Sequence, residues 1–478
     1  MLETHHFACL SDQTLPLVWN EFRLVFHFLP YDDEINGNLV NTISHMENFP
    51  LFAPDIKING KYSINLNCSA KMSGAAVLVP RRDRTGYHYQ ANMMTIQWLL
   101  PLIFLQVILS GCSRQFSDFD VGIAGDGNLN NVLEHIRADH GLPALAVILV
   151  RSGEVVESEA VGVRAVGSPE QVTLSDRWHL GSNTKSMTAT LAGLLVEEGA
   201  IRWETTIGEV FPNFPERTRP EYKNVRLEEL FSQTAGLPKN EMQIPSYSKS
   251  RQSTETLSEQ RRQWTRELLA LEPEAQRGTH HYANANYVVA AAMLETVAGK
   301  PWEEMLRQKI LNPLGMTSTG FGAPGTRGQV PDQPRGHHRK QGELHPLPPG
   351  LSSDNPPAIG PAGTVHTTLA DFARYMAAHL AGARGEQGLV SVETFGKLHS
   401  PAPGTRYALG WSVGKHSGAG GRTISHNGSN GAWFARMWIA PERDFAILTL
   451  TNVGGDEGAK GTDEALRALI DRCNAAFE

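Results

Sequence analysis

Residues 181–197 read Gly-Ser-Asn-Thr-Lys-Ser-Met-Thr-Ala-Thr-Leu-Ala-Gly-Leu-Leu-Val-Glu. The apolar positions, Met187 and Leu191 among them, recur at the spacing of an α-helix. Ser182 and Lys185 stand three positions apart where this predicted helix begins, so their side chains face the same side. A helix N-terminus also favours developing negative charge. Ser182 is therefore the candidate nucleophile of an acyl-transfer enzyme, and Lys185 is the group that activates it.

The chemistry explains why these two residue types belong together. A serine hydroxyl is a poor nucleophile until a neighbouring base takes its proton. A lysine that is partly removed from water has a lowered pKa, so it can be that base or can lower the pKa of another group.

Two other Ser-x-x-Lys matches show that the pattern alone is weak, since a chain of this composition should contain about one by chance. Ser246–Lys249 lies in a polar segment that follows Pro245, and Ser412–Lys415 lies at the end of a predicted strand. Neither segment predicts a helix, so Ser182 is the candidate that we retain.

Two further motifs follow in the chain. Tyr282-Ala283-Asn284 precedes an apolar helical pattern, and His426-Asn427-Gly428, followed by Ser429, lies between strand-like segments. Taken singly, each residue has a more common structural role. Such a tyrosine is more often a half-buried aromatic, such an asparagine a helix N-cap, and such a histidine a hydrogen-bonded structural residue. Together with Ser-x-x-Lys, in this order, they resemble the motifs of the serine β-lactamase and penicillin-binding-protein superfamily, in particular its class C β-lactamase-like branch. The resemblance covers residues 128–475.

The resemblance implies roles for the first two motifs. Ser182 attacks a carbonyl and becomes the acyl-enzyme, and Lys185 activates it. The phenol of Tyr282 shuttles the proton, with a pKa lowered by the nearby ammonium. Asn284 positions Lys185 and hydrogen-bonds the amide of the substrate.

The third motif is expected to line the substrate-binding strand. Gly428 has no side chain, so the strand can approach the substrate closely. The backbone N–H groups of Ser182 and Ser429 would form the oxyanion hole, which contributes about 3 kcal/mol per donor. The resemblance implies no cofactor and no metal. His337, His338 and His345 lie in a predicted polar loop, and their spacing matches no ordered zinc site.

His426 departs from the best-known β-lactamases, which have a lysine at this position. A lysine supplies a fixed positive charge for the carboxylate of a β-lactam or a peptide, whereas a histidine is mostly neutral at pH 7. We therefore expect esterase activity on small acyl esters, with β-lactam hydrolysis slow or absent. The alternatives within the hydrolases are a β-lactamase and a D-amino-acid peptidase. The alternative outside them is a penicillin-binding sensor or scaffold without turnover.

The pattern of predicted elements favours an α+β fold over residues 128–478. Strand-like segments occur at both ends of this region: 144–150, 155–163, 407–414, 422–426, 432–439 and 445–451. Helical patterns occupy the middle and the end: 129–140, 264–271, 285–297, 302–310 and 464–476. Thr368 is expected to cap another helix, and residues 322–363 are expected to form a long loop with at most one short strand. The prediction is one antiparallel sheet built from both termini, flanked by helices, with a helical insert domain: a β-lactamase/transpeptidase-like fold.

An apolar segment, residues 98–109, has the length of the central region of a signal peptide and is too short to span a bilayer. It ends in Leu-Ser-Gly-Cys112, which resembles a lipoprotein cleavage and lipidation site. We expect residues 93–111 to be a lipoprotein-type signal peptide, Cys112 to carry lipid, and residues 112–127 to be a tether. The membrane would then be a partner, and the location would be the bacterial cell envelope, on its periplasmic or outer-membrane side. A buried helix in a larger fold is the alternative.

Two features of the residues before this segment differ from those of an ordinary signal peptide. Residues 93–97 contain no Lys or Arg, and residues 1–92 precede the signal, although signals begin a chain. The simplest hypothesis is that translation starts at Met93, Met94 or Met72 and that residues 1–92 are an upstream extension.

Composition excludes some partners. The net charge is −7, so the chain lacks the basic surface of a nucleic-acid-binding protein. Four widely spaced cysteines do not form the pattern of a disulfide-rich secreted domain. The expected partner is a small-molecule or peptide substrate with an acyl group.

Overall fold

The computed structural model describes residues 120–214 and 218–477, and the backbone of four short strands earlier in the chain. The chain divides into two units, residues 1–115 and 116–478. The first unit contains two antiparallel pairs: β1 (Ile56–Ile58) with β2 (Tyr62–Ile64), and β3 (Arg81–Asp83) with β4 (Gly86–His88). The predicted signal segment 93–111 and Cys112 lie outside the described residues.

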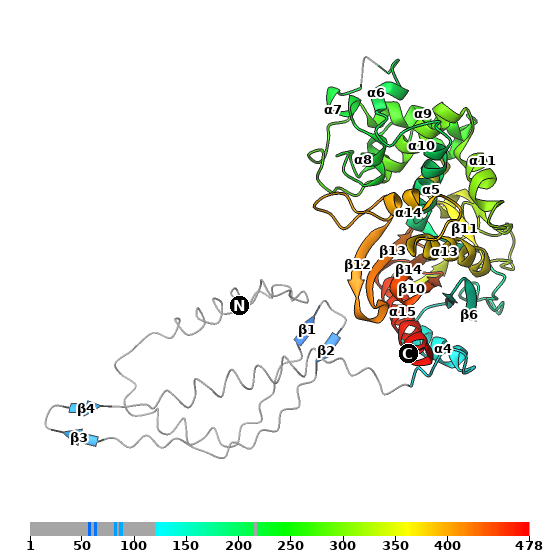
Figure 1. Cartoon of the computed structure of the whole chain (residues 1–478). Helices are drawn as coiled ribbons and strands as arrows, with labels where there is room; N and C mark the ends of the chain where they lie inside the picture. Colours follow the sequence, from blue (N-terminus) through cyan, green and yellow to red (C-terminus); the bar gives the residue numbers. More distant parts are fainter. Residues whose placement is uncertain are drawn as a thin grey trace. The chain divides into compact units, whose positions relative to one another are not determined.

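The second unit is built on one six-stranded sheet in the order β12-β13-β14-β15-β5-β6. Every neighbouring pair is antiparallel. The strands are β12 (Ser412–His416), β13 (Gly421–Ser429), β14 (Phe434–Ala440), β15 (Phe445–Thr451), β5 (Ala144–Arg151) and β6 (Glu154–Gly162). The N-terminal hairpin β5–β6 thus extends the C-terminal strands, which confirms the predicted α+β sheet built from both ends of the region (Figure 1).

Strand β5 is buried on both faces, and its alternate residues belong to two separate cores. Ala146 and Ile148 point into the larger core, whereas Leu145 and Val147 point into the smaller one. Helices α4 (Leu129–Asp139) and α15 (Gly455–Phe477) cover the smaller core, and α13 (Leu369–Ala383) packs on β5 from the other side. Burying an aliphatic side chain of this size contributes about 1.5–3 kcal/mol.

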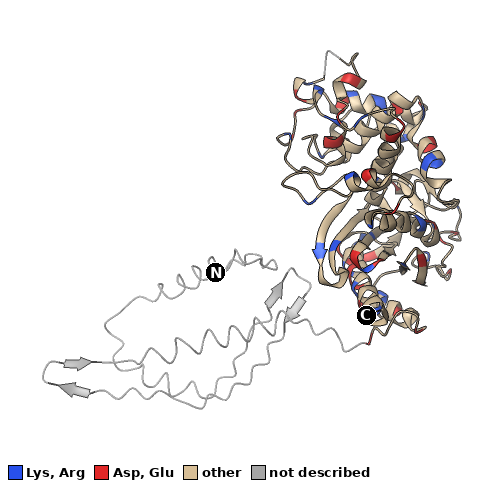
Figure 2. Cartoon of the chain, viewed as in Figure 1, with Lys and Arg blue, Asp and Glu red and all other residues tan. Residues whose placement is uncertain are grey.

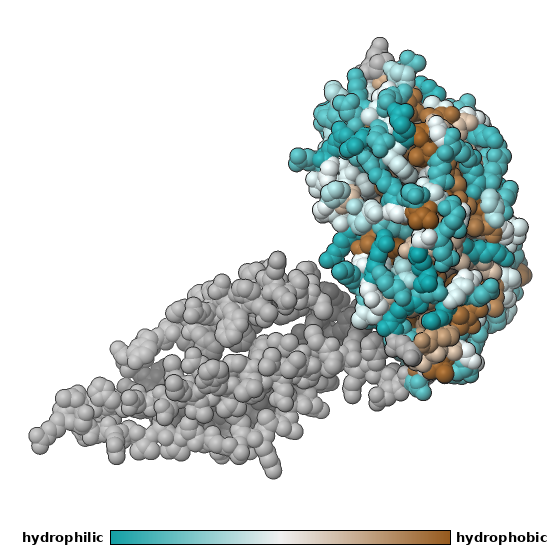
Figure 3. Space-filling view, in the orientation of Figure 1, coloured by the Kyte–Doolittle hydropathy of each residue, from teal (hydrophilic) through white to brown (hydrophobic). Residues whose placement is uncertain are grey.

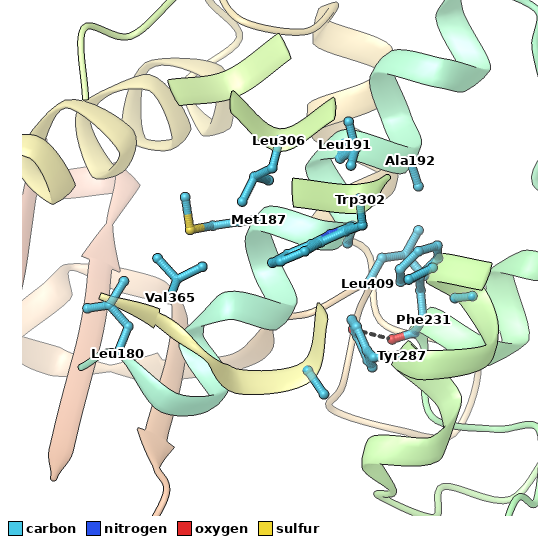
Figure 4. Packing of buried hydrophobic residues seen from close by; sticks show 14 of the residues in the cluster. Leu180, Met187, Leu191, Ala192, Phe231, Tyr287, Trp302, Leu306, Val365 and Leu409 are labelled. Atoms are coloured by element: carbon cyan, nitrogen blue, oxygen red, sulfur yellow. Dashed lines mark hydrogen bonds between the residues drawn. The ribbon is translucent and has the colours of Figure 1, made fainter. Parts of the chain in front are cut away.

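A helical region extends the larger core away from the sheet (Figure 1). Its helices are α5 (Thr184–Glu197), α6 (Ile207–Val210), α7 (Pro220–Lys223), α8 (Leu227–Phe231), α9 (Leu257–Leu268), α10 (Asn284–Ala298), α11 (Trp302–Leu306) and α14 (Val392–Leu398). A π-helical turn, Arg307–Leu311, continues α11. Figure 4 shows Met187 of α5 packed near Leu306 of α11, with Trp302 beside them. In the same core the Tyr287 hydroxyl of α10 donates to the Phe231 carbonyl of α8 at 2.9 Å.

A small sheet places the candidate nucleophile. Its strands are ordered β7 (Trp178–His179), β11 (Val365–Thr367) and β8 (Gly320–Phe321). The chain leaves β7 at Leu180, forms the 3-10 turn Gly181–Asn183 and enters α5. The short helix α12 (Gly360–Gly363) and the Gly181–Asn183 turn both contact α5, and the same turn contacts β13. The start of α5 therefore lies where the helical region meets the main sheet.

Several elements differ from their predicted bounds. Helix α9 begins at Leu257 rather than near Trp264, because Thr256 and Glu259 form a capping box that starts it earlier. Helix α15 begins at Gly455 rather than near Glu464, although its first turns are rich in glycine, because packing against β14 and β15 overrides that low helix propensity.

Two predicted irregular or extended segments also differ. The predicted strand 407–414 is extended only from Ser412, and the residues before it form a tight turn in which Tyr407 bridges to Ser412. Residues 322–363 contain a hairpin, β9 (His337–Lys340) with β10 (Glu343–Pro346), followed by short helical turns. The prediction of at most one short strand there was wrong.

The described end of the predicted tether is held against the domain. Arg472 of α15 pairs with Asp126 at 2.7 Å and with Glu157 of β6 at 2.6 Å. The backbone N–H of Ala124 donates to the Arg472 carbonyl at 3.1 Å. Residues 120–127 are thus anchored to the last helix.

The visible face of the second unit carries interspersed charges of both signs (Figure 2). Hydrophilic residues cover much of it, and apolar residues form separate patches among them (Figure 3). Of the helices that the structure describes, none is both long and apolar enough to traverse a bilayer.

Candidate functional site

Ser182 lies in the turn that precedes α5 and is half-buried. The residue before it, Gly181, has a φ of +51°, a conformation that glycine adopts without strain. A Cβ on Gly181 would lie 2.3 Å from the backbone nitrogen of Ser429, so only glycine lets this turn approach β13 so closely. The turn therefore presents Ser182 to the end of that strand.

Lys185 stands one turn further, in the first turn of α5, and its side chain is fully buried. Its Nζ lies 2.9 Å from Ser182 Oγ, 2.8 Å from Asn284 Oδ1 and 2.7 Å from the Ala362 carbonyl oxygen. Burial lowers the pKa of Lys185 to about 7, and the negative charge of Glu241 opposes part of that decrease. Near neutral pH a large fraction of this lysine is therefore an uncharged amine.

The two acceptors deepest in the site orient that amine. In its neutral form Nζ has two N–H groups, which Asn284 Oδ1 and the Ala362 carbonyl can accept. The remaining lone pair then faces Ser182 Oγ, which is the direction a base needs to take the hydroxyl proton.

Tyr282 lies just before α10, and its hydroxyl interacts with the side chain of Ser182 closely enough to affect the pKa of the phenol. Lys185 Nζ lies over the face of its ring, 4.9 Å from the ring centre. Burial raises the pKa of Tyr282 above its ordinary value, and the interaction with Ser182 offsets only part of the increase. The expectation that the ammonium lowers this pKa was wrong, because removal of the phenol from water dominates.

Asn284 is the first residue of α10. Its Oδ1 faces Lys185, and its Nδ2 donates to Glu241 Oε1 at 3.0 Å. Helix α10 and the turn Glu241–Gln243 thus meet at one side-chain amide.

Gly428 and Ser429 end strand β13 beside the nucleophile turn. A Cβ on Gly428 would lie 1.9 Å from the Leu180 carbonyl oxygen and 2.7 Å from the Ser182 backbone nitrogen. The Ser429 hydroxyl donates to the Trp433 carbonyl at 2.6 Å, which leaves its backbone N–H as the group near Gly181. The backbone nitrogens of Ser182 and Ser429 are therefore neighbours, as two donors to one oxyanion must be.

His426 lies two residues earlier on β13 and is buried. Its Nδ1 donates to the Asn427 carbonyl at 2.7 Å, and its Nε2 accepts from the Tyr407 hydroxyl at 2.9 Å. Burial, reinforced by the charge of Lys185, lowers the pKa of His426 to about 3. The imidazole is thus neutral at physiological pH, and both of its nitrogens are engaged by the protein.

The structure brings all seven predicted catalytic and substrate-binding residues of the second unit to one place: Ser182, Lys185, Tyr282, Asn284, His426, Gly428 and Ser429. The other Ser-x-x-Lys serines lie elsewhere. Ser246 donates to Glu267 at 2.6 Å, and Ser412 begins an edge strand. Cys112, the predicted lipidation site, lies outside the described residues.

Several groups at the site were not predicted. Glu241 and Tyr407 contact site residues from segments that carry no motif, and Ala362 acts through its backbone carbonyl. Glu241 lies in a polar segment, residues 239–263, whose composition alone does not single out a site residue. Within the described residues, no group of three or more His, Cys, Asp or Glu side chains is placed to hold a metal ion.

Comparison with known proteins gives one family. The sequence model of the family described as Beta-lactamase matches residues 129–472. The chain is 24% identical over 306 residues to Unguisins hydrolase ungD' of Aspergillus campestris, covering 61% of this chain but only 55% of that protein. It is also 24% identical over 340 residues to Penicillin-binding protein 4 of Amycolatopsis lactamdurans, covering 67% and 83% of the two chains.

Among solved structures, the D-amino acid amidase of Ochrobactrum anthropi SV3 superposes with a TM-score of 0.57 at 22% sequence identity. The match covers 72% of this chain and 99% of that one. This likeness shows a shared fold.

Proposed function

Because the chain belongs to the Beta-lactamase family, we propose that it is a serine hydrolase that works through an acyl-enzyme at Ser182. The observation that carries the proposal is the 2.9 Å approach of Lys185 Nζ to Ser182 Oγ, with a lysine pKa of about 7. A buried amine at this distance is a base for the serine hydroxyl at neutral pH.

The reaction has two halves. Ser182 Oγ bonds to the carbonyl carbon while its proton passes to Lys185 Nζ, directly or through Tyr282. The carbonyl oxygen becomes an oxyanion held by the Ser182 and Ser429 N–H groups, and the leaving group departs with the proton. A water molecule then attacks the acyl carbonyl, gives up a proton by the same route, and releases a carboxylic acid and free Ser182. Removing one oxyanion donor typically lowers kcat by about 100- to 1,000-fold.

We propose esters and amides, rather than β-lactams, as the preferred substrates. His426 is neutral, and both of its ring nitrogens already have protein partners, so it offers no fixed positive charge to the carboxylate of a β-lactam. Assays with nitrophenyl esters and a chromogenic cephalosporin test this. Rapid cephalosporin turnover with no ester cleavage would reverse the ranking.

A penicillin-binding sensor or scaffold is the second candidate, because relatives in the family include a protein named for penicillin binding. A fluorophosphonate probe and a fluorescent penicillin distinguish the two. A hydrolase turns over esters and loses both label and activity in Ser182→Ala. A sensor keeps a stoichiometric penicillin label without turnover. Full activity in Ser182→Ala would defeat both candidates.

We also propose that the mature protein is lipid-anchored at Cys112 in a bacterial cell envelope, with the membrane as its partner. The support is the Leu-Ser-Gly-Cys sequence after an apolar segment of signal-peptide length. Intact-mass analysis of the native protein tests this. The expected mass begins at a lipid-modified Cys112, and a mature N-terminus well before Cys112 would contradict it.

A further inference from the structure

Glu241 places a carboxylate at the edge of the candidate site. It begins the 3-10 turn Glu241–Gln243, is partly exposed, and accepts a 3.0 Å hydrogen bond from Asn284 Nδ2 through Oε1. Its charge raises the pKa of Lys185 against the effect of burial, so it is close enough to act on the ammonium. The side-chain amide of Asn284 thus connects Glu241 to Lys185, the base that serves Ser182.

This contact changes what Asn284 can offer to a substrate. The family resemblance assigns the amide of this asparagine to the amide group of the substrate, where Nδ2–H would donate to a carbonyl oxygen. Here that N–H already donates to a carboxylate, and hydrogen bonds to charged acceptors are about twice as strong as neutral ones. An N-acyl substrate must therefore displace Glu241, and its carbonyl oxygen meets a negative charge.

A free ammonium reverses both effects. It donates to the carboxylate instead of competing with it, and the Asn284–Glu241 bond stays intact because the carboxylate has further lone pairs to accept a second donor. The opposite charges also attract, more strongly at a partly buried site than in bulk water. In a substrate with a free amine, the ammonium on the carbon next to the scissile carbonyl occupies the position that the amide nitrogen has in an N-acyl substrate.

We propose that Glu241 is a specificity-determining residue that selects acyl donors with a free α-ammonium group, namely aminoacyl amides and aminoacyl esters, over their N-acylated forms. This inference rests on the proposed acyl-enzyme function at Ser182. It names the chemical class of the acyl group and leaves the leaving group open.

The test compares two matched substrates. Alanine p-nitroanilide and N-acetyl-alanine p-nitroanilide, each as D and L forms, differ only in the charge and capping of the amine. The native enzyme is expected to favour the free amine in kcat/KM by about 10- to 100-fold, the value of one charge-assisted hydrogen bond. Glu241→Gln keeps an oxygen that can accept from Asn284 but removes the charge. It is expected to lose most of this preference, with a much larger fall for the free amine than for the acetylated substrate.

Glu255→Gln is the matched control, because Glu255 is an exposed acid in the same polar segment. It changes the net charge equally and is expected to keep the native preference. Equal losses on both substrates in Glu241→Gln would overturn the inference and make Glu241 a support for Asn284 only. No preference in the native enzyme would also overturn it. Fluorophosphonate labelling of Ser182 separates the two proposals: labelling with no amine preference defeats this inference alone, whereas no labelling and no turnover defeat both.

Discussion

The ring of His179 holds the backbone of Gly181, the residue just before Ser182. The Gly181 N–H donates to His179 Nδ1 at 3.1 Å, so the ring proton must be on Nε2, which donates to Asp354 Oδ2 at 3.0 Å. The other oxygen of Asp354 accepts from Asn430 Nδ2 at 2.9 Å. One buried carboxylate therefore ties the turn before the nucleophile to the turn after β13.

Asp354→Asn is expected to lower kcat by about tenfold or more while KM changes little, because it loosens the two segments that carry the oxyanion donors. An amide in place of the carboxylate cannot accept from both His179 and Asn430 without presenting N–H to one donor. Steady-state kinetics on a nitrophenyl ester measure kcat and KM. A thermal unfolding curve of the same variant gives the fraction that is folded at the assay temperature. A fall in stability with unchanged kcat in the folded fraction would assign Asp354 to folding alone.

The pH dependence of the reaction follows from Lys185. Only the neutral amine accepts the Ser182 proton, and the pKa of Lys185 is lowered to about 7. On an uncharged ester, kcat/KM is therefore expected to rise with pH through about 7 and to level off above it. A profile from pH 5 to 9 shows this limb. A flat profile across neutral pH would mean that another group is the base.

Glu241→Gln is expected to move that limb to lower pH. The carboxylate stabilises the ammonium form of Lys185 and so raises its pKa. Removing the charge leaves burial unopposed, the pKa falls, and the neutral amine persists at more acidic pH. The same uncharged ester serves for this measurement, since it reports the lysine without the effect on cationic substrates. A shift to higher pH would contradict the placement of Glu241 near Lys185.

Gly428→Ala is expected to abolish most activity, with a loss of about 100-fold or more, because β13 must move away from the nucleophile turn. The added Cβ would lie 1.9 Å from a backbone oxygen, and backbone atoms cannot swing aside as a side chain can. Gly396→Ala in α14 is the control: its Cβ meets nothing within 4 Å, and alanine stabilises a helix interior by about 1 kcal/mol relative to glycine. Ester kinetics and urea unfolding of both variants give the comparison. Near-native activity in Gly428→Ala would show that the close approach is dispensable.

The sequence predicted the parts of the site that depend on short motifs. Ser182 and Lys185 are neighbours because residues three positions apart lie on the same side of a helical turn. Asn284 begins α10, the helix that the apolar pattern of residues 285–297 predicted. The short apolar segments at both ends of the domain predicted the sheet: residues 144–151 and 445–451 are nearly continuous apolar runs, and both strands are buried along almost their whole length.

Other features depend on contacts between distant segments, which no local pattern encodes. Glu241 reaches Asn284 across 43 positions, and Ala362 contributes a backbone atom that every residue has. The pKa of Tyr282 was predicted in the wrong direction because the sequence shows that a lysine is near but not how much water is excluded. The hairpin β9–β10 was missed because a polar, proline-rich segment shows little strand periodicity.

The meeting of Gly181 with Ser429 also has a consequence for the order of folding. These residues are far apart in the chain, and strand β13 joins the sheet only through β14 and β15 to β5. Contacts between residues so far apart in sequence tend to form late, because closing the intervening loop costs conformational entropy before the contacts contribute any favourable free energy. A refolding chain should therefore regain helical signal before it regains esterase activity. We therefore expect catalytic competence to return last, since the two oxyanion donors come together only when the turn Gly181–Asn183 meets the end of β13.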